Sequence, residues 1–184
     1  MNSTELSPVT QNKLYGFNNT FLEVVDLYNK KRLPNSILFS GQKGVGKSTL
    51  AYHFINYIFS QNEEFKYNLE KLEINTSNKS FKLVTSNSHP NFYLLDVVDD
   101  KNVIEVSQIR KMITYTNKSS FNNKERIILI DNVEKLNLNS LNALLKITEE
   151  PNVNVFFILI FDNNKKILDT LRSRCLKFNF SLNY

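Results

Sequence analysis

The residues best suited to chemistry form one loop, Gly41-Gln42-Lys43-Gly44-Val45-Gly46-Lys47-Ser48, which fits the pattern GxxxxGK[ST]. Its glycines let backbone N–H groups approach the oxygens of a phosphate without obstruction by side chains. Lys47 is placed to reach β- and γ-phosphates, and the Ser48 hydroxyl to ligate Mg²⁺. The alternative is a glycine turn that only joins a strand to a helix. The predicted ATP-binding residues of this stretch are Gly41, Gly44, Val45, Gly46, Lys47, Ser48 and Thr49.

Asp131 is the second candidate, because it directly follows the apolar run Arg126-Ile127-Ile128-Leu129-Ile130. A carboxylate at the end of a central parallel strand is typical of a metal ligand opposite a phosphate loop. Asp131 is therefore predicted to hold Mg²⁺ together with Ser48, mostly through water. The alternative is a carboxylate that merely ends a strand.

Strands and helices that alternate along the chain must position these groups. Strands are predicted at residues 36–40, 91–96, 126–131, 155–161 and 176–180. Helices are predicted from an Asn18 or Asn19 cap to before Pro34, from 48 to about 60, at 106–113, at 141–150 behind an Asn139-Ser140 cap, and at 165–172. A turn is predicted at Asp99-Asp100-Lys101, and short helices or a loop at 61–88. This alternation predicts an α/β fold, a parallel sheet with helices on both faces, which binds ligands at the carboxyl ends of its strands.

Length and composition bound the remaining choices. A chain of 184 residues suits one domain, predicted at 14–184 after a loose segment at 1–13. The net charge of +5 is compatible with nucleic acid nearby, but it is not concentrated in a basic block. Cys175 is the single cysteine, so an internal disulfide and a zinc site built from cysteines are excluded. The polar N-terminus and the absence of a long apolar stretch predict a cytoplasmic protein without membrane contact.

Two later segments carry a resemblance to a known family. Leu141-Asn142-Ala143-Leu144-Leu145-Lys146-Ile147-Thr148-Glu149-Glu150-Pro151 is similar to the NALLKxLEEP signature of bacterial clamp-loader AAA+ subunits, and Ser173-Arg174-Cys175 resembles their SRC motif. The resemblance covers about residues 8–181. It implies a RecA-like AAA+ P-loop NTPase domain with a five-stranded sheet of order 5-1-4-3-2. It also implies lid and collar domains, which the sequence, ending at Tyr184, does not include.

Within the family, the chain is more similar to delta-prime subunits of DNA polymerase III than to gamma/tau subunits. Leu33–Phe39 and Ser88–Phe92 resemble delta-prime segments, and the stretch 61–88 holds none of the cysteines of the gamma/tau zinc module. The resemblance implies a hetero-pentamer with gamma/tau and delta subunits. That complex would load a sliding clamp on primed DNA during replication, so this chain would meet clamp and DNA indirectly.

The resemblance also assigns roles to single residues. Arg174 matches the arginine finger that such a subunit presents in trans to its neighbour's ATP; the alternative is a salt bridge at the subunit edge. Asn132 stands where active ATPases carry the glutamate that orients the attacking water, which implies weak or no hydrolysis in cis. Glu134 could substitute only if the strand end bends. The sensor position falls at Asp162 or Asn163, with Asn163 preferred because an acidic side chain repels a phosphate.

Direct contact with DNA is a weak expectation. Arg110 matches the family's basic position on the helix that tracks DNA, but Glu105 replaces a basic residue just before that helix. Two other functions stay open from the sequence. One is an autonomous AAA+ ATPase, such as a gamma/tau-like motor, and the other is a structural stator with a vestigial nucleotide site.

Overall fold

The computed structural model describes residues 7–98, 102–118, 124–166 and 169–181. Contacts along the chain divide the protein into two compact units, each described here by itself. The first unit comprises Met1–Arg32 and Gly46–His89, and the second comprises Leu33–Val45 and Pro90–Tyr184. The turn predicted at Asp99-Asp100-Lys101 lies outside the described residues.

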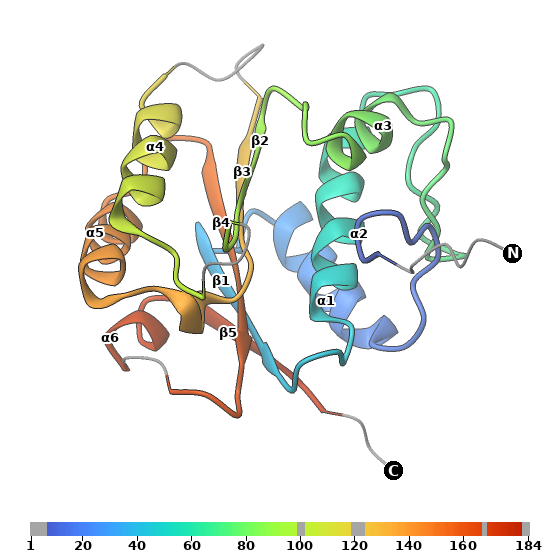
Figure 1. The fold of residues 1–184 in the computed structure, drawn as a ribbon. Helices are drawn as coiled ribbons and strands as arrows, with labels where there is room; N and C mark the ends of the chain where they lie inside the picture. The colour runs from blue at the N-terminus through green and yellow to red at the C-terminus, as the bar shows by residue number, and fades with distance from the viewer. Residues whose placement is uncertain (1–6, 99–101, 119–123, 167–168, 182–184) are drawn as a thin grey trace, which may run out of the picture. The chain divides into compact units, whose positions relative to one another are not determined.

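The second unit contains a five-stranded sheet in which every pair of neighbours is parallel (Figure 1). The strands are β1 (Ser36–Gly41), β2 (Phe92–Leu95), β3 (Arg126–Ile130), β4 (Val155–Asp162) and β5 (Leu176–Phe180). Their order is β2-β3-β4-β1-β5, which confirms the order predicted from the sequence, counted from the other edge.

Burial along the strands explains why they were recognisable in the sequence. All six residues of β1 and all five of β3 are buried, as expected for central strands of a parallel sheet. The edge strand β5 instead buries Phe178 and Phe180 and exposes the residues between and before them. Alternation with period two is typical of a strand with one face toward the core.

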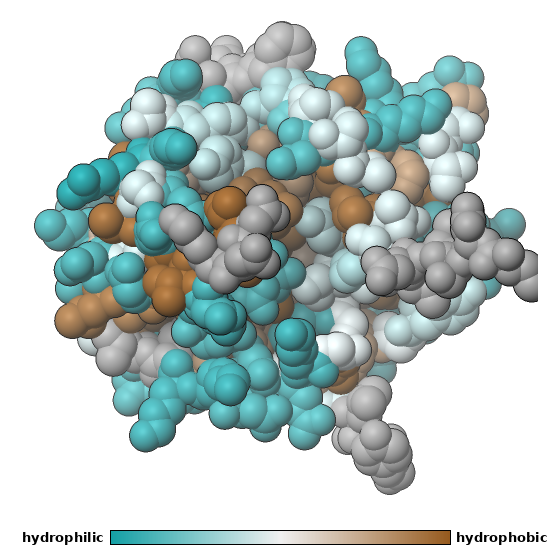
Figure 2. Space-filling model, viewed as in Figure 1, coloured by the Kyte–Doolittle hydropathy of each residue, from teal (hydrophilic) through white to brown (hydrophobic). Residues whose placement is uncertain are grey.

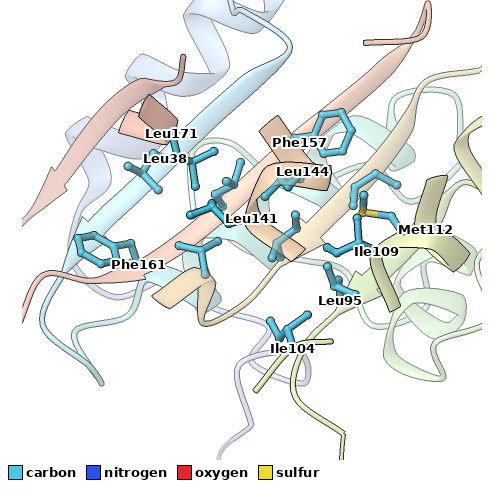
Figure 3. Packing of buried hydrophobic residues seen from close by; sticks show 14 of the residues in the cluster. Leu38, Leu95, Ile104, Ile109, Met112, Leu141, Leu144, Phe157, Phe161 and Leu171 are labelled. Atoms are coloured by element: carbon cyan, nitrogen blue, oxygen red, sulfur yellow. The ribbon is translucent and has the colours of Figure 1, made fainter. Parts of the chain in front are cut away.

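Three helices and a short 3₁₀ helix of the second unit pack against the sheet. They are α4 (Val106–Thr116), η2 (Val133–Lys135), α5 (Leu138–Glu149) and α6 (Asp169–Arg172). Ile109 and Met112 of α4 and Leu144 of α5 are fully buried in one cluster with strand residues such as Phe157 (Figure 3). Spacings of three and four residues place these side chains on one face of each helix.

The start of α5 differs from the prediction. The helix is capped by Asn137, whose side chain accepts a hydrogen bond from the Ser140 backbone N–H at 2.9 Å. The predicted Asn139-Ser140 cap is therefore wrong, because an earlier asparagine already satisfies that N–H group. The Ser140 hydroxyl is used elsewhere, donating to the Ile104 carbonyl at 2.7 Å. Of the helix predicted at 165–172, Lys165 and Lys166 are not helical, and α6 is described over Asp169–Arg172.

The first unit contains α1 (Asn18–Asn29), α2 (Lys47–Ser60) and α3 (Lys79–Thr85). The predicted cap of α1 at Asn18 or Asn19 is wrong: the N-cap is Phe17, in the left-handed region with φ 54°, and among the described residues no side chain caps it by a hydrogen bond. The predicted short structure within 61–88 is present as α3, which is capped by the Asn78 side chain at the Phe81 N–H, 2.7 Å away.

Aromatic residues fill the interior of the first unit. The rings of Phe21 and Tyr67 lie 5.3 Å apart between centroids, and the ring of His53 lies edge-on to both. Residues near the N-terminus join the same unit, since the Asn12 carbonyl accepts from the Ile74 N–H at 2.7 Å and Lys13 pairs with Glu73 in an antiparallel bridge.

Candidate nucleotide-binding site

The glycine loop connects β1 to α2, and the boundary between the two units falls inside it, between Val45 and Gly46. The predicted site residues therefore form two groups, each described within its own unit. The first unit holds Gly46, Lys47, Ser48 and Thr49, and the second holds Gly41, Gly44, Val45, Asp131, Asn163 and Arg174.

In the first unit, the predicted residues begin the helix α2. Gly46 is its N-cap with φ 105°, a conformation that side chains other than glycine rarely adopt. The Leu50 N–H donates to the Gly46 carbonyl at 3.0 Å, which closes the first turn and places Lys47, Ser48 and Thr49 in it. The N–H groups of a helix's first turn point away from its body and attract anions. Lys47 is buried, with 5% of its surface exposed.

In the second unit, a glycine is required at positions 41 and 44 for different reasons: lack of space at Gly41 and backbone conformation at Gly44. A Cβ atom on Gly41 would lie 2.4 Å from the backbone oxygen of Phe180, so the close approach of β5 excludes a side chain there. At Gly44 a Cβ atom would have no described atom within 4 Å, but the φ of 83° is strained for any other residue. The requirement at Gly44 fits a glycine of a phosphate-binding loop, whereas the one at Gly41 comes from the packing of the sheet.

Asp131 lies at the carboxyl end of β3, where its side chain accepts a hydrogen bond from the Asn132 N–H at 2.9 Å. Asn132 is in the left-handed region with φ 58°, and its side-chain amide donates to Asp96 Oδ1 at 2.9 Å. Asp96 was not among the site residues predicted from the sequence. The available signal was that Asp96 follows β2 as Asp131 follows β3, so both carboxylates reach the same edge of a parallel sheet.

The end of β4 carries the predicted sensor position. The Asn163 N–H donates to the Gly41 carbonyl at 3.2 Å, which ties this residue to the start of the glycine loop. Asp162 is the last residue of β4, and its N–H donates to Glu134 Oε2 at 3.2 Å. Glu134 lies in η2, after the left-handed Asn132, and its carboxylate is engaged by the Asp162 N–H, so its substitution for the catalytic glutamate stays a prediction.

Arg174 makes an ion pair within its own chain. Its Nη2 donates to Glu149 Oε1 at the end of α5, and its Nη1 donates to the Thr170 carbonyl at 2.6 Å. The salt bridge considered as the alternative role is therefore present. Exposed fractions of 33% for the Arg174 side chain and 47% for that of Glu149 leave the pair open to water. Burial raises the pKa of the neighbouring Cys175 thiol to about 11, so it stays protonated near neutral pH.

Arg110 lines a groove of about 730 Å³ between α4 and α5. The groove has an apolar floor that includes Val106 and Ile113, and its rim carries Arg110, Lys146 and Glu150. Hydrophilic residues cover much of the surface over these helices, with hydrophobic residues showing between them (Figure 2). The charges at the rim are mixed in sign, as on an ordinary protein surface.

In the part of the chain that the structure describes, no group of three or more His, Cys, Asp or Glu side chains is arranged to hold a metal ion. Likewise, none of the described helices combines the length and the apolar character needed to span a bilayer.

Known proteins resemble this chain in sequence and in fold. The delta-prime subunit of DNA polymerase III from Buchnera aphidicola subsp. Schizaphis graminum is 29% identical over 88% of this chain and 47% of its own length. The delta-prime subunit from Bacillus subtilis is 31% identical over 84% of this chain and 45% of its own length. Gamma and gamma/tau subunits are matched as well. The chain thus spans less than half the length of the delta-prime relatives.

A solved structure of a DNA polymerase III gamma subunit-related protein from Thermotoga maritima matches with a TM-score of 0.61 at 18% identity. The match covers 88% of this chain and 46% of the other, and it confirms the AAA+ fold class. A sequence model of the family described as "DNA polymerase III, delta subunit" matches residues 18–183, nearly the whole chain. The chain therefore belongs to the DNA polymerase III delta subunit family.

Proposed function

We propose that this chain is the ATP-binding region of a delta-prime-like clamp-loader subunit. In this proposal it binds ATP with Mg²⁺, assembles with gamma/tau and delta subunits, and supplies Arg174 to the nucleotide site of a neighbour. The complex then helps to place a sliding clamp on primed DNA during replication. Membership in a bacterial replication family supports a place in the cytoplasm.

The glycine loop is the observation that carries the proposal. Gly44 and Gly46 are left-handed, a conformation that allows a loop to direct backbone N–H groups at an anion, and Lys47 adds a cation in the first turn of α2. These donors suit the oxygens of a triphosphate. The hydroxyl of Ser48 and the carboxylate of Asp131 are hard oxygen ligands, the type that Mg²⁺ prefers. Bound Mg²⁺ would neutralise charge on the phosphates.

Hydrolysis by this chain alone is not part of the proposal. Asn132 stands at the position of the catalytic carboxylate, and its amide is directed at Asp96. An amide does not accept a proton at neutral pH, so it cannot act as a general base toward water. This argues against an autonomous motor and in favour of a subunit that contributes chemistry to its neighbour.

To reach a neighbour, Arg174 must leave two exposed partners, the Glu149 carboxylate and the Thr170 carbonyl, and water can replace both. An ion pair as exposed as that of Arg174 with Glu149 stabilises a protein by about 0–1 kcal/mol. A neighbour's triphosphate carries more negative charge than one carboxylate and suits the planar guanidinium. The pair with Glu149 therefore fits an arginine finger that is held in place until a neighbouring subunit presents its nucleotide.

A reconstituted complex tests the proposal. The protein is mixed with gamma/tau and delta subunits, assembly is verified by size-exclusion chromatography, and clamp-stimulated ATP hydrolysis is measured. The Arg174→Ala protein should assemble normally, but ATP hydrolysis should slow roughly 10³-fold at the neighbour's nucleotide site that Arg174 faces. The hydrolysis rate of the whole complex should then fall by the fraction that this site contributes. Arg172→Ala is the matched control, because Arg172 is an exposed arginine paired only locally with Asp169. An unchanged rate with Arg174→Ala would rule out the finger.

A further inference from the structure

The strand β4 extends beyond its neighbour β3. The last residue pair between them is Ile130 with Leu159, whereas β4 continues to pair with β1 until Asp162 faces Gly41. Three residues of β4 thus run past the end of β3 toward the glycine loop. A strand end without a paired neighbour on one side needs another acceptor for its N–H groups.

The direction of each N–H group follows from the strand geometry. The N–H groups of Phe157 and Asn163 both donate to the β1 side, to Asn35 and Gly41 at 2.7 and 3.2 Å. Successive residues of a strand direct their N–H groups to opposite neighbours, so that of Asp162 points to the β3 side. The carboxylate of Glu134 accepts this hydrogen bond at 3.2 Å, in place of a strand.

Glu134 reaches Asp162 because the chain turns back after β3. Asn132 is in the left-handed region, and the short helix η2 then carries Glu134 alongside the end of β4. Elements η2 and β4 are in contact in the structure. Two consecutive N–H groups are thus fixed on opposite sides of the strand end. That of Asp162 donates to Glu134, and that of Asn163 donates to the carbonyl of Gly41.

We propose that Glu134 is a positioning residue that fixes the end of β4 and thereby orients Asn163 relative to the phosphate loop. This inference rests on the proposed function, in which Asn163 senses the terminal phosphate of the nucleotide. Glu134 itself acts through the backbone of Asp162, as a hydrogen-bond acceptor and not as a base. A glutamine keeps an acceptor oxygen at the same place, whereas an alanine does not.

Amide hydrogen exchange tests the hydrogen bond without any ligand. Glu134→Ala should speed exchange at the backbone N–H groups of Asp162 and Asn163, and Glu134→Gln should leave it near the wild-type rate. Glu70→Ala is the matched control, because Glu70 is an exposed carboxylate in the first unit. Unchanged exchange at both positions in Glu134→Ala would show that Glu134 does not hold the strand end.

Nucleotide discrimination tests the consequence. The ratio of the affinities for ATPγS and ADP is measured for each variant, because only the terminal phosphate distinguishes the two ligands. Glu134→Ala should lower this ratio by about tenfold or more, the size expected for the loss of one hydrogen bond to a charged group. Glu134→Gln should restore the ratio, which a loss of stability alone would not do.

The outcomes separate this inference from the proposed function. Binding that depends on Lys47, together with an unchanged ratio in Glu134→Ala, overturns the positioning role but leaves the function standing. Equal affinities of the wild-type protein and of Lys47→Ala contradict the function itself. The amide exchange of Asp162 then still decides whether Glu134 holds the end of β4.

Discussion

Gly41 belongs both to the glycine loop and to the sheet. The motif assigns it to the phosphate loop, but it is also the last residue of β1, pressed against the backbone of Phe180 in β5. Its φ lies outside the left-handed region, unlike those of Gly44 and Gly46. Its small size is therefore required by the sheet, and in the proposed function it would also let a phosphate approach the backbone.

Gly41→Ala should destabilise the protein by about 1–3 kcal/mol, because the added Cβ must displace backbone of β5 and not a flexible side chain. Urea unfolding followed by circular dichroism measures this change. Gly16→Ala is the control. Its φ of 77° is strained for alanine, but a Cβ atom there would meet no described atom within 4 Å. That variant should cost about 1 kcal/mol. A Gly41→Ala protein as stable as the wild type would contradict the packing described for β5.

Partners of single residues could not be predicted from the sequence. Asp96 and Asn132 are 36 positions apart, and Glu149 and Arg174 are 25 apart. Such contacts depend on which strand ends become neighbours and on the rotamers at those ends. The loop residues were recognisable because a phosphate site constrains residue types at fixed spacing, whereas a hydrogen bond between distant positions leaves no comparable pattern.

At the scale of elements, a buried histidine joins three segments of the first unit. His53 of α2 is fully buried, its Nδ1 lies 2.8 Å from the Tyr67 hydroxyl, and its Nε2 lies 3.1 Å from the Gln11 carbonyl. A carbonyl only accepts, so Nε2 carries the proton and Nδ1 accepts from Tyr67. Burial lowers the pKa of His53 to about 4, and it raises the pKa of Tyr67.

This histidine predicts how stability depends on pH. The unfolded chain binds a proton at His53 below about pH 6.5, whereas the folded protein does so only near pH 4. Between these values the unfolded state holds more protons, so stability is present above pH 6.5 and is lost as the pH falls. The loss attributable to His53 is at most about 3 kcal/mol.

Unfolding curves at pH 7.0 and 4.5 measure this loss. His53→Gln should be less stable than the wild type at pH 7.0 but should lose less stability on acidification. His89→Gln is the matched control, since it removes the other histidine, which stacks on Phe59, and should keep the steep loss. Equal losses in His53→Gln and wild type would contradict a neutral buried His53.

The type and order of elements were predictable, but several of their boundaries were not. Buried apolar runs identify β1, β3 and β4, because few other structures accommodate three to seven consecutive apolar residues between turns. Helix starts depend on single side chains. Asn137, Asn139 and Ser140 are all suitable caps of α5 by type, and the choice of Asn137 leaves the Ser140 hydroxyl for Ile104.

At the scale of the molecule, the chain combines a parallel sheet unit with a helical unit, and the glycine loop runs from one to the other. The family match covers residues 18–183, while the delta-prime relatives are more than twice as long as the part that matches. Assembly and clamp loading are therefore proposals for the whole protein. Binding of ATP with Mg²⁺ is the part of the proposal that depends directly on residues described here.

Titration of the protein with a fluorescent ATP analogue in the presence of Mg²⁺ tests this claim most directly. We expect saturable binding that weakens when Mg²⁺ is removed. In Lys47→Ala the affinity should fall about 10- to 100-fold, because a charged hydrogen-bond donor is lost. Lys43→Ala, at an exposed position of the same loop, should bind like the wild type. No saturable binding at millimolar nucleotide, or equal affinity of Lys47→Ala and wild type, would contradict the account.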